Sequence, residues 1–63
     1  MCLSTVYRNE VKPENIAMQN VMCIECQGDK VLLTDLMERQ MSLQGTLLMA
    51  NLVEGLAVVR ETA

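Results

Sequence analysis

The sequence contains no histidine, tryptophan or phenylalanine, and its single aromatic residue is Tyr7. Histidine is the commonest metal ligand and a frequent general base. Any metal site must therefore use thiolate, thioether, carboxylate, amine or backbone nitrogen donors. The core must be assembled from Val, Leu, Ile and Met, and the stacking platforms that single-stranded nucleic-acid binders use are missing.

Clustered positive charge and long apolar runs are missing as well. The net charge is -3, and the basic residues are never adjacent: Arg8, Lys12, Lys30, Arg39 and Arg60. Nucleic-acid binders need clustered cations to displace counterions from phosphates, so this composition argues against a nucleic-acid partner. The sequence has neither a membrane-spanning run of about 18 apolar residues nor a signal peptide. We therefore expect a soluble, cytoplasmic protein, with no membrane partner, whose cysteines stay reduced.

The 63 residues predict one domain, over residues 1–63. A domain of about 60 residues buries only about 60% of the surface that its unfolded chain exposes, so its stability benefits from a metal, disulfides or a second subunit. Hydrophobic residues make up 51% of the chain, more than one small core easily hides. This excess predicts self-association.

Short runs of strand length, separated by turn signals, predict an all-β fold. Alternating apolar and polar residues in "CLSTVY" follow the period of two of a strand, and "GD" between two apolar runs is typical of a tight hairpin. We expect a small antiparallel barrel of about six strands. The runs are residues 2–7, 16–26, 30–36, 39–44, 46–54 and 56–61.

Residues 31–49 also permit a helical interpretation. Leu33, Leu36, Met37 and Gln40 are spaced by three and four residues, and Leu, Met, Glu and Gln are good helix formers. One short helical turn in this region is therefore the alternative to continuous strands.

Cys23 and Cys26 form "CIEC", a C-x-x-C spacing that is found in zinc and redox sites. Residues i and i+3 of a strand point to opposite faces, so the two sulfurs cannot share a metal or a disulfide without a bend. We interpret them as structural residues of a strand.

The methionines and carboxylates have ordinary structural explanations. The methionines show no compact M-x-x-M cluster for copper(I), so we expect most of them to fill a core that lacks aromatics. Asp29, Asp35 and Glu38 occupy predicted turns or strand ends, where solvated carboxylates are usual. Ser4 and Thr5 have no identifiable activating base, so we do not expect an enzyme. The methionines are Met1, Met18, Met22, Met37, Met41 and Met49.

Cys2 differs from the other cysteines because of its position. If Met1 is removed, Cys2 carries an amine and a thiol that can close a five-membered chelate ring on a metal. If Met1 is retained, a deprotonated backbone amide can supply the nitrogen instead. Nitrogen and sulfur donors together favour square-planar nickel(II) or copper(II).

The whole pattern resembles the CooT family of small bacterial and archaeal proteins. The resemblance is carried by the opening "MCLSTVY", by "NVMCIECQGDKVLLTDLMERQ", by Gly45 and by the tail "LLMANLVEGLAVVRE". It implies a homodimeric β-barrel that binds nickel(II) through Cys2 of each subunit. It also implies a role as a nickel chaperone or store for a nickel enzyme such as carbon monoxide dehydrogenase.

Two other functions stay open at this point. The family has also been described as RNA-binding on the strength of barrel similarity, which predicts an SH3-like or Sm-like module with salt-dependent RNA binding. A metal-free interaction module would instead use an exposed strand edge or an apolar face to join a larger complex.

Overall fold

The computed structural model describes residues 3–62 and contains, within that range, five strands and one short 3-10 helix, η1. The chain is therefore all-β, as predicted. The elements are β1 (Ser4–Arg8), η1 (Pro13–Asn15), β2 (Ile16–Gln27), β3 (Lys30–Asp35), β4 (Gln40–Asn51) and β5 (Leu56–Glu61).

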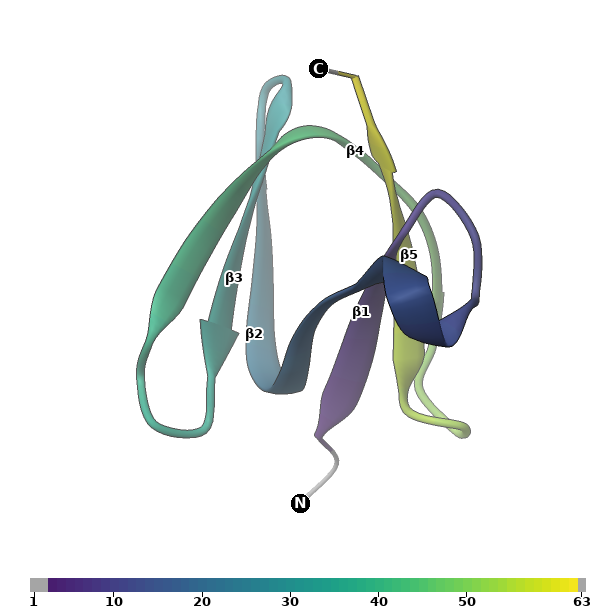
Figure 1. Ribbon diagram of the computed structural model, residues 1–63. Coiled ribbons are helices and arrows are strands. Elements are labelled where there is room, and N and C mark those ends of the chain that lie inside the picture. The colour runs from purple at the N-terminus through teal and green to yellow at the C-terminus, as the bar shows by residue number, and fades with distance from the viewer. Residues whose placement is uncertain (1–2, 63) are drawn as a thin grey trace.

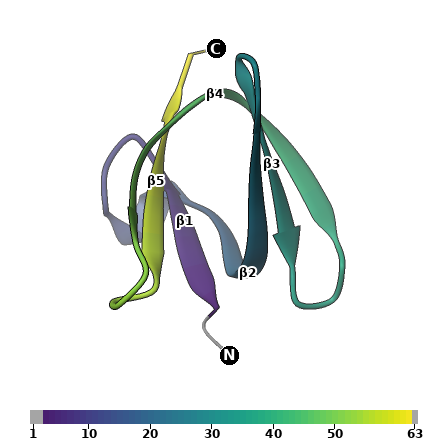
Figure 2. The same ribbon diagram turned by 180° about the vertical axis from the view of Figure 1, so that it is seen from behind.

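The strands form a closed barrel in the order β1-β2-β3-β4-β5 (Figures 1 and 2). Four neighbouring pairs are antiparallel, while β1 and β5 are parallel. Strands that alternate in direction leave the first and fifth pointing the same way, so a ring of five must contain one parallel pair. The prediction of a small antiparallel barrel is confirmed, with five strands where about six were expected and one parallel pair that closes the ring.

Gly45 explains the difference in strand number. The predicted strands 39–44 and 46–54 are largely one strand, β4, which bends over the barrel at the top of Figure 1. A Cβ atom on Gly45 would collide with the carbonyl group of Arg60 on β5. Glycine here allows a close approach of two paired strands, whereas the sequence predicted a break between two strands at this position.

The predicted hairpin at "GD" is confirmed. Gln27 pairs with Lys30, so Gly28 and Asp29 form a two-residue turn. Gly28 has a φ angle of 64°, which glycine adopts without the steric cost of a side chain. The alternative of a helical turn within 31–49 is wrong, because this segment forms β3, a turn and β4. The 3-10 turn lies instead at Pro13–Asn15.

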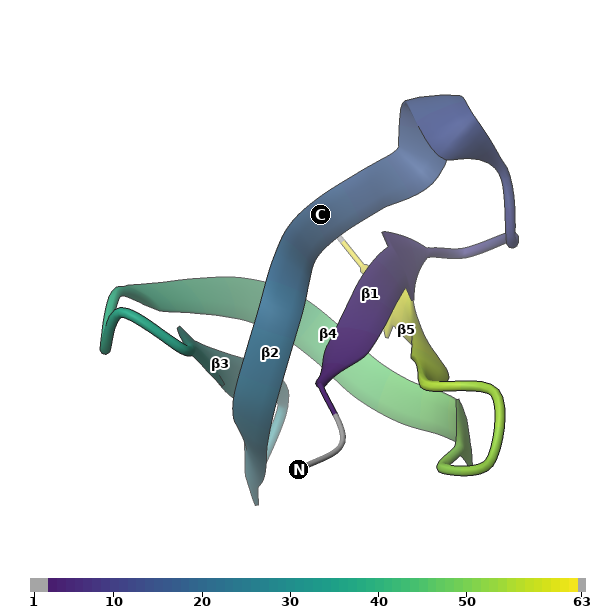
Figure 3. The same cartoon turned by 90° about the horizontal axis from the view of Figure 1, so that it is seen from below.

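The core consists of small aliphatic side chains from all five strands. Figure 3 shows β1 between β2 and β5, as the pairing requires. None of the five methionines within residues 3–62 is fully buried, so the prediction that most of the methionines fill the core is wrong. Met18 and Met41 are partly buried and pack against the core from outside. Met22, Met37 and Met49 are exposed. The buried cluster is Val6, Val21, Val31, Leu33, Leu43, Ala57 and Val59.

Within residues 3–62, no helix has the length and apolar character needed to cross a membrane.

Candidate functional site

Cys2, the predicted metal ligand, lies outside the described residues. The structure does describe what surrounds the start of β1. Ser4 is paired with Val21 of β2, and the Thr5 amide donates a hydrogen bond of 2.9 Å to the carbonyl oxygen of Gly55. The chain that follows Cys2 is thus fixed between β2 and the turn that precedes β5.

A cavity of about 270 Å³ opens beside this start of β1. Ser4 contributes to its wall, and most of the other lining side chains are apolar. They come from the middle of β2, the last part of β4 and the turn that follows it. The lining residues are Ser4, Val21, Met22, Cys23, Ile24, Leu47, Ala50 and Leu52.

Cys23 and Cys26 both lie on β2, as predicted, and both are free and exposed. Cys23 lines the cavity beside Ser4, whereas Cys26 does not. Cys26 pairs with Val31 near the far end of β2, three ladder positions from the pairing of Cys23 with Thr34. Only the thiol of Cys23 therefore lies beside the start of β1. The C-x-x-C spacing alone does not indicate this difference between the two cysteines. Within residues 3–62, no group of three or more His, Cys, Asp or Glu residues is arranged to hold a metal.

Exposed aliphatic side chains concentrate on the last part of β4 and the turn to β5. Leu52 is 72% exposed and Val53 is 98% exposed, and Leu48 and Met49 are also exposed. Met22 and Leu52 are exposed side chains that also line the cavity beside Ser4. We call the set Met22, Leu48, Met49, Leu52 and Val53 the apolar margin. Its composition is unusual for a surface that faces only water.

Asp35 is a buried charged residue, which the sequence did not predict. Its place in the sequence predicts a solvated carboxylate at a turn or strand end, but only 4% of the residue is exposed. Its Oδ1 accepts hydrogen bonds of 2.9 Å from the backbone amides of Met37 and Arg39. Its Oδ2 accepts one of 2.8 Å from Nε of Arg39. The spacing Asp-x-x-x-Arg after an apolar strand was the available signal for this arrangement.

These contacts determine the ionisation of Asp35. Burial alone raises the pKa of the carboxyl, since it disfavours the charged form. The hydrogen bonds from Arg39 and Met37 and the positive charge of Arg39 outweigh burial, so the pKa lies below its ordinary value. Asp35 is therefore a charged acceptor that organises the β3–β4 turn. Asp29 and Glu38 are exposed, as predicted.

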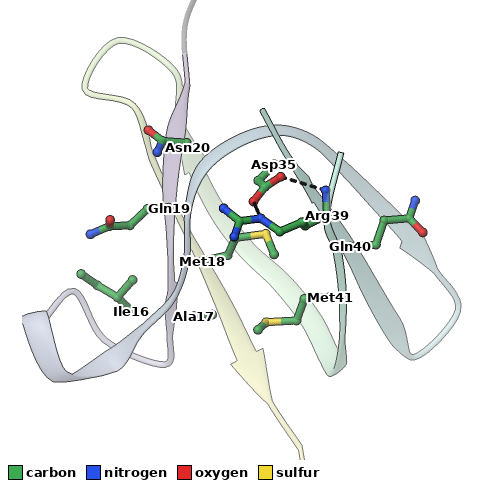
Figure 4. Close-up of a pocket in the computed structure, with 9 residues that line it drawn as sticks. All are labelled: Ile16, Ala17, Met18, Gln19, Asn20, Asp35, Arg39, Gln40 and Met41. Carbon is green, nitrogen blue, oxygen red and sulfur yellow. Dashed lines mark hydrogen bonds and ion pairs between the residues drawn. The ribbon is translucent and has the colours of Figure 1, made fainter. Parts of the chain in front are cut away.

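A second cavity, of about 490 Å³, lies between this turn and the first half of β2 (Figure 4). Met18 and Met41 contribute apolar surface to it, and Arg39 contributes the positive charge. This cavity shares no lining residue with the one beside Ser4.

The chain matches the model of a known protein family. The family model described as "CO dehydrogenase accessory protein CooT" matches residues 1–60 of the chain. No curated protein matches it significantly. The matched range includes both N-terminal residues, Met1 and Cys2, and covers the barrel except for Glu61, the last residue of β5.

Proposed function

The chain belongs to the CooT family of CO dehydrogenase accessory proteins, and on that premise we propose that it binds nickel(II) through Cys2 of each subunit of a homodimer. Its role is to store nickel or deliver it during maturation of a nickel enzyme, such as carbon monoxide dehydrogenase. It is a cytoplasmic metal-binding protein rather than an enzyme.

The observation that carries the proposal is that the family match begins at residue 1 and so includes Cys2. Thiolate and nitrogen donors on one residue suit nickel(II) in a planar site. The chain contains no histidine, which leaves sulfur and nitrogen of the N-terminal residues as the donors to be tested first.

The apolar margin supports the dimer. A second subunit that covers Leu52 and Val53 would remove two highly exposed aliphatic side chains from water. The cavity beside Ser4 adjoins this surface through Leu52. An interface here places the chain next to Cys2 of one subunit close to its partner, as a metal shared by two subunits requires.

The test is a nickel(II) titration of the reduced protein followed by ultraviolet-visible absorption. We expect thiolate-to-nickel charge-transfer bands that saturate at one metal per two chains and are lost in Cys2→Ser. Cys23→Ser and Cys26→Ser serve as matched controls, since both replace an exposed thiol of β2. Bands that persist in Cys2→Ser, or no bands in the native protein, would refute the site. In the second case, a metal-free interaction module becomes the better interpretation.

Two further measurements examine the same proposal. Because protons compete with nickel for thiolates, the nickel affinity must fall on acidification. An affinity independent of pH would contradict thiolate ligation.

A Leu52→Ser/Val53→Ser variant should shift sedimentation towards the monomer and weaken nickel binding, since the metal binds the assembled form. An unchanged dimer in this variant would show that the interface lies elsewhere.

A further inference from the structure

The cavity between the β3–β4 turn and β2 has no part in the proposed nickel site. It has a volume of about 490 Å³ and is lined by the first part of β2 and by residues of the turn and of β4. In Figure 4, the guanidinium of Arg39 and the thioethers of Met18 and Met41 project into the middle of the lining residues, while Gln19 and Gln40 point outward. The cavity therefore combines one cation with apolar surface.

Arg39 is held in place by only one edge of its guanidinium. Nε donates to Oδ2 of Asp35 at 2.8 Å, yet the side chain is 76% exposed. The two terminal nitrogens, Nη1 and Nη2, make no hydrogen bond to any of residues 3–62. This terminal edge carries parallel N–H groups that match the two oxygens of a carboxylate.

Asp35 orients the guanidinium before any ligand arrives. Both of its oxygens are engaged, with two backbone amides on Oδ1 and the Arg39 Nε on Oδ2. A side chain that is fixed in advance loses less conformational entropy on binding than a free one, so the arrangement favours an incoming anion. The nearby carboxylate offsets much of the guanidinium charge, so the site compensates the desolvation cost of a monoanion more fully than the larger cost of a dianion.

Met18 and Met41 indicate that the rest of the ligand is apolar. Met18 and Met41 are partly buried and pack against the core, so their flexible thioethers offer an adaptable apolar surface next to Arg39. We propose that this cavity binds a monocarboxylate with an aliphatic body. The carboxylate accepts hydrogen bonds from Nη1 and Nη2 of Arg39, and the body lies on Met18 and Met41.

Two sources share this chemistry: a free aliphatic acid, and the C-terminal residue of a peptide. The experiment follows backbone amide signals by two-dimensional NMR of the full chain during titration with hexanoate, hexanamide, an acetylated tripeptide ending in leucine, and the C-terminal amide of that tripeptide. We expect saturable shifts at residues 17–20 and 36–41 with the two acids, and binding at least about tenfold weaker with the two amides. A preference for hexanoate identifies a free acid, and a preference for the tripeptide identifies a peptide terminus.

Variants decide whether Arg39 is responsible. Arg39→Gln should weaken hexanoate binding about tenfold or more, and Arg39→Lys should retain only part of the affinity, because lysine keeps the charge but not the paired donors. Arg8→Gln is the matched control, since Arg8 pairs with Glu61 and does not line the cavity. Arg39→Gln leaves both backbone hydrogen bonds to Asp35 in place, and an unchanged amide spectrum elsewhere verifies its fold.

Three results would overturn the proposal. These are the absence of saturable shifts with either acid, equal binding of acids and amides, and equal losses in Arg39→Gln and Arg8→Gln. None of them affects the nickel titration, so this inference and the proposed nickel site fail or succeed separately.

Discussion

The two turns that flank β4 share one hydrogen-bonding pattern but differ in burial and charge. At the β3–β4 turn, Oδ1 of Asp35 accepts two backbone amides, and at the β4–β5 turn, Oδ1 of Asn51 accepts the amides of Val53 and Glu54 at 3.2 and 3.0 Å. Asp35 is buried and charged and is paired with Arg39. Asn51 is neutral and half-buried, and its amide nitrogen donates to Glu54 at 3.0 Å.

The difference shows how burial changes the contribution of this hydrogen-bonding pattern to the stability of the fold. Loss of a buried charged acceptor leaves several donors without a partner in a region shielded from water, whereas water can replace a neutral acceptor near the surface. The charged turn is accordingly the more sensitive to mutation and pH. The neutral turn carries Leu52 and Val53, whose exposure suits a contact surface.

The largest effect is expected at Gly45, midway along the strand that joins the two turns. In Gly45→Ala the new methyl group meets the Arg60 carbonyl, so β4 and β5 must separate locally. We expect a loss of about 3 kcal/mol or more in the free energy of unfolding, measured by urea denaturation.

Gly28→Ala is the control for Gly45→Ala. A Cβ atom at Gly28 has open space around it, although its φ angle of 64° is unfavourable for alanine. Its cost should be only about 1–2 kcal/mol. If the two variants were equally stable, the close approach of β4 to Arg60 would not limit stability.

Asp35→Ala should have the next largest effect, because three donors lose their acceptor at once. We expect the melting temperature to fall by roughly 10 °C or more. Asp35→Asn should lie between this variant and the native protein, since its amide oxygen still accepts backbone N–H groups. A loss no greater than that of Asn51→Ala would mean that burial does not distinguish the two turns.

Acidification should weaken the Asp35 turn. The folded pKa of Asp35 lies below its ordinary value, so its contribution is complete at higher pH. It is lost as the pH falls from the unfolded value of about 3.9 through the lower folded value. Urea denaturation at a series of pH values between about 6 and 3 should show this loss in the native protein and in Asn51→Ala. An equal slope in Asp35→Asn would assign the pH dependence to other carboxyls.

Asn51→Ala should have the smallest effect. It removes an acceptor for two amides that water can reach, which costs about 1 kcal/mol and lowers the melting temperature by roughly 4–8 °C. Thermal denaturation followed by circular dichroism measures the change. A fall in melting temperature as large as that of Asp35→Ala would mean that the two turns contribute equally to stability.

Much of the molecule follows from the sequence through local chemistry. Alternation predicted the strands, "GD" predicted the hairpin at Gly28, and the motifs at both ends predicted the family that the match over residues 1–60 confirms. These signals are readable because turn residues and strand periods act over only a few positions. Cys2 was likewise selected by its position in the sequence, and its role as a ligand stays a prediction.

Only the tertiary structure decided the features that depend on distant neighbours. Gly45 bends a strand rather than ending it because Arg60 of β5 lies against it. The parallel β1–β5 pair arises because the ring closes with five strands. Asp35 became a buried charge because the backbone of its own turn folds over the carboxylate and β2 packs beside it. Each of these depends on which segments meet in space, which a local pattern of residues does not specify.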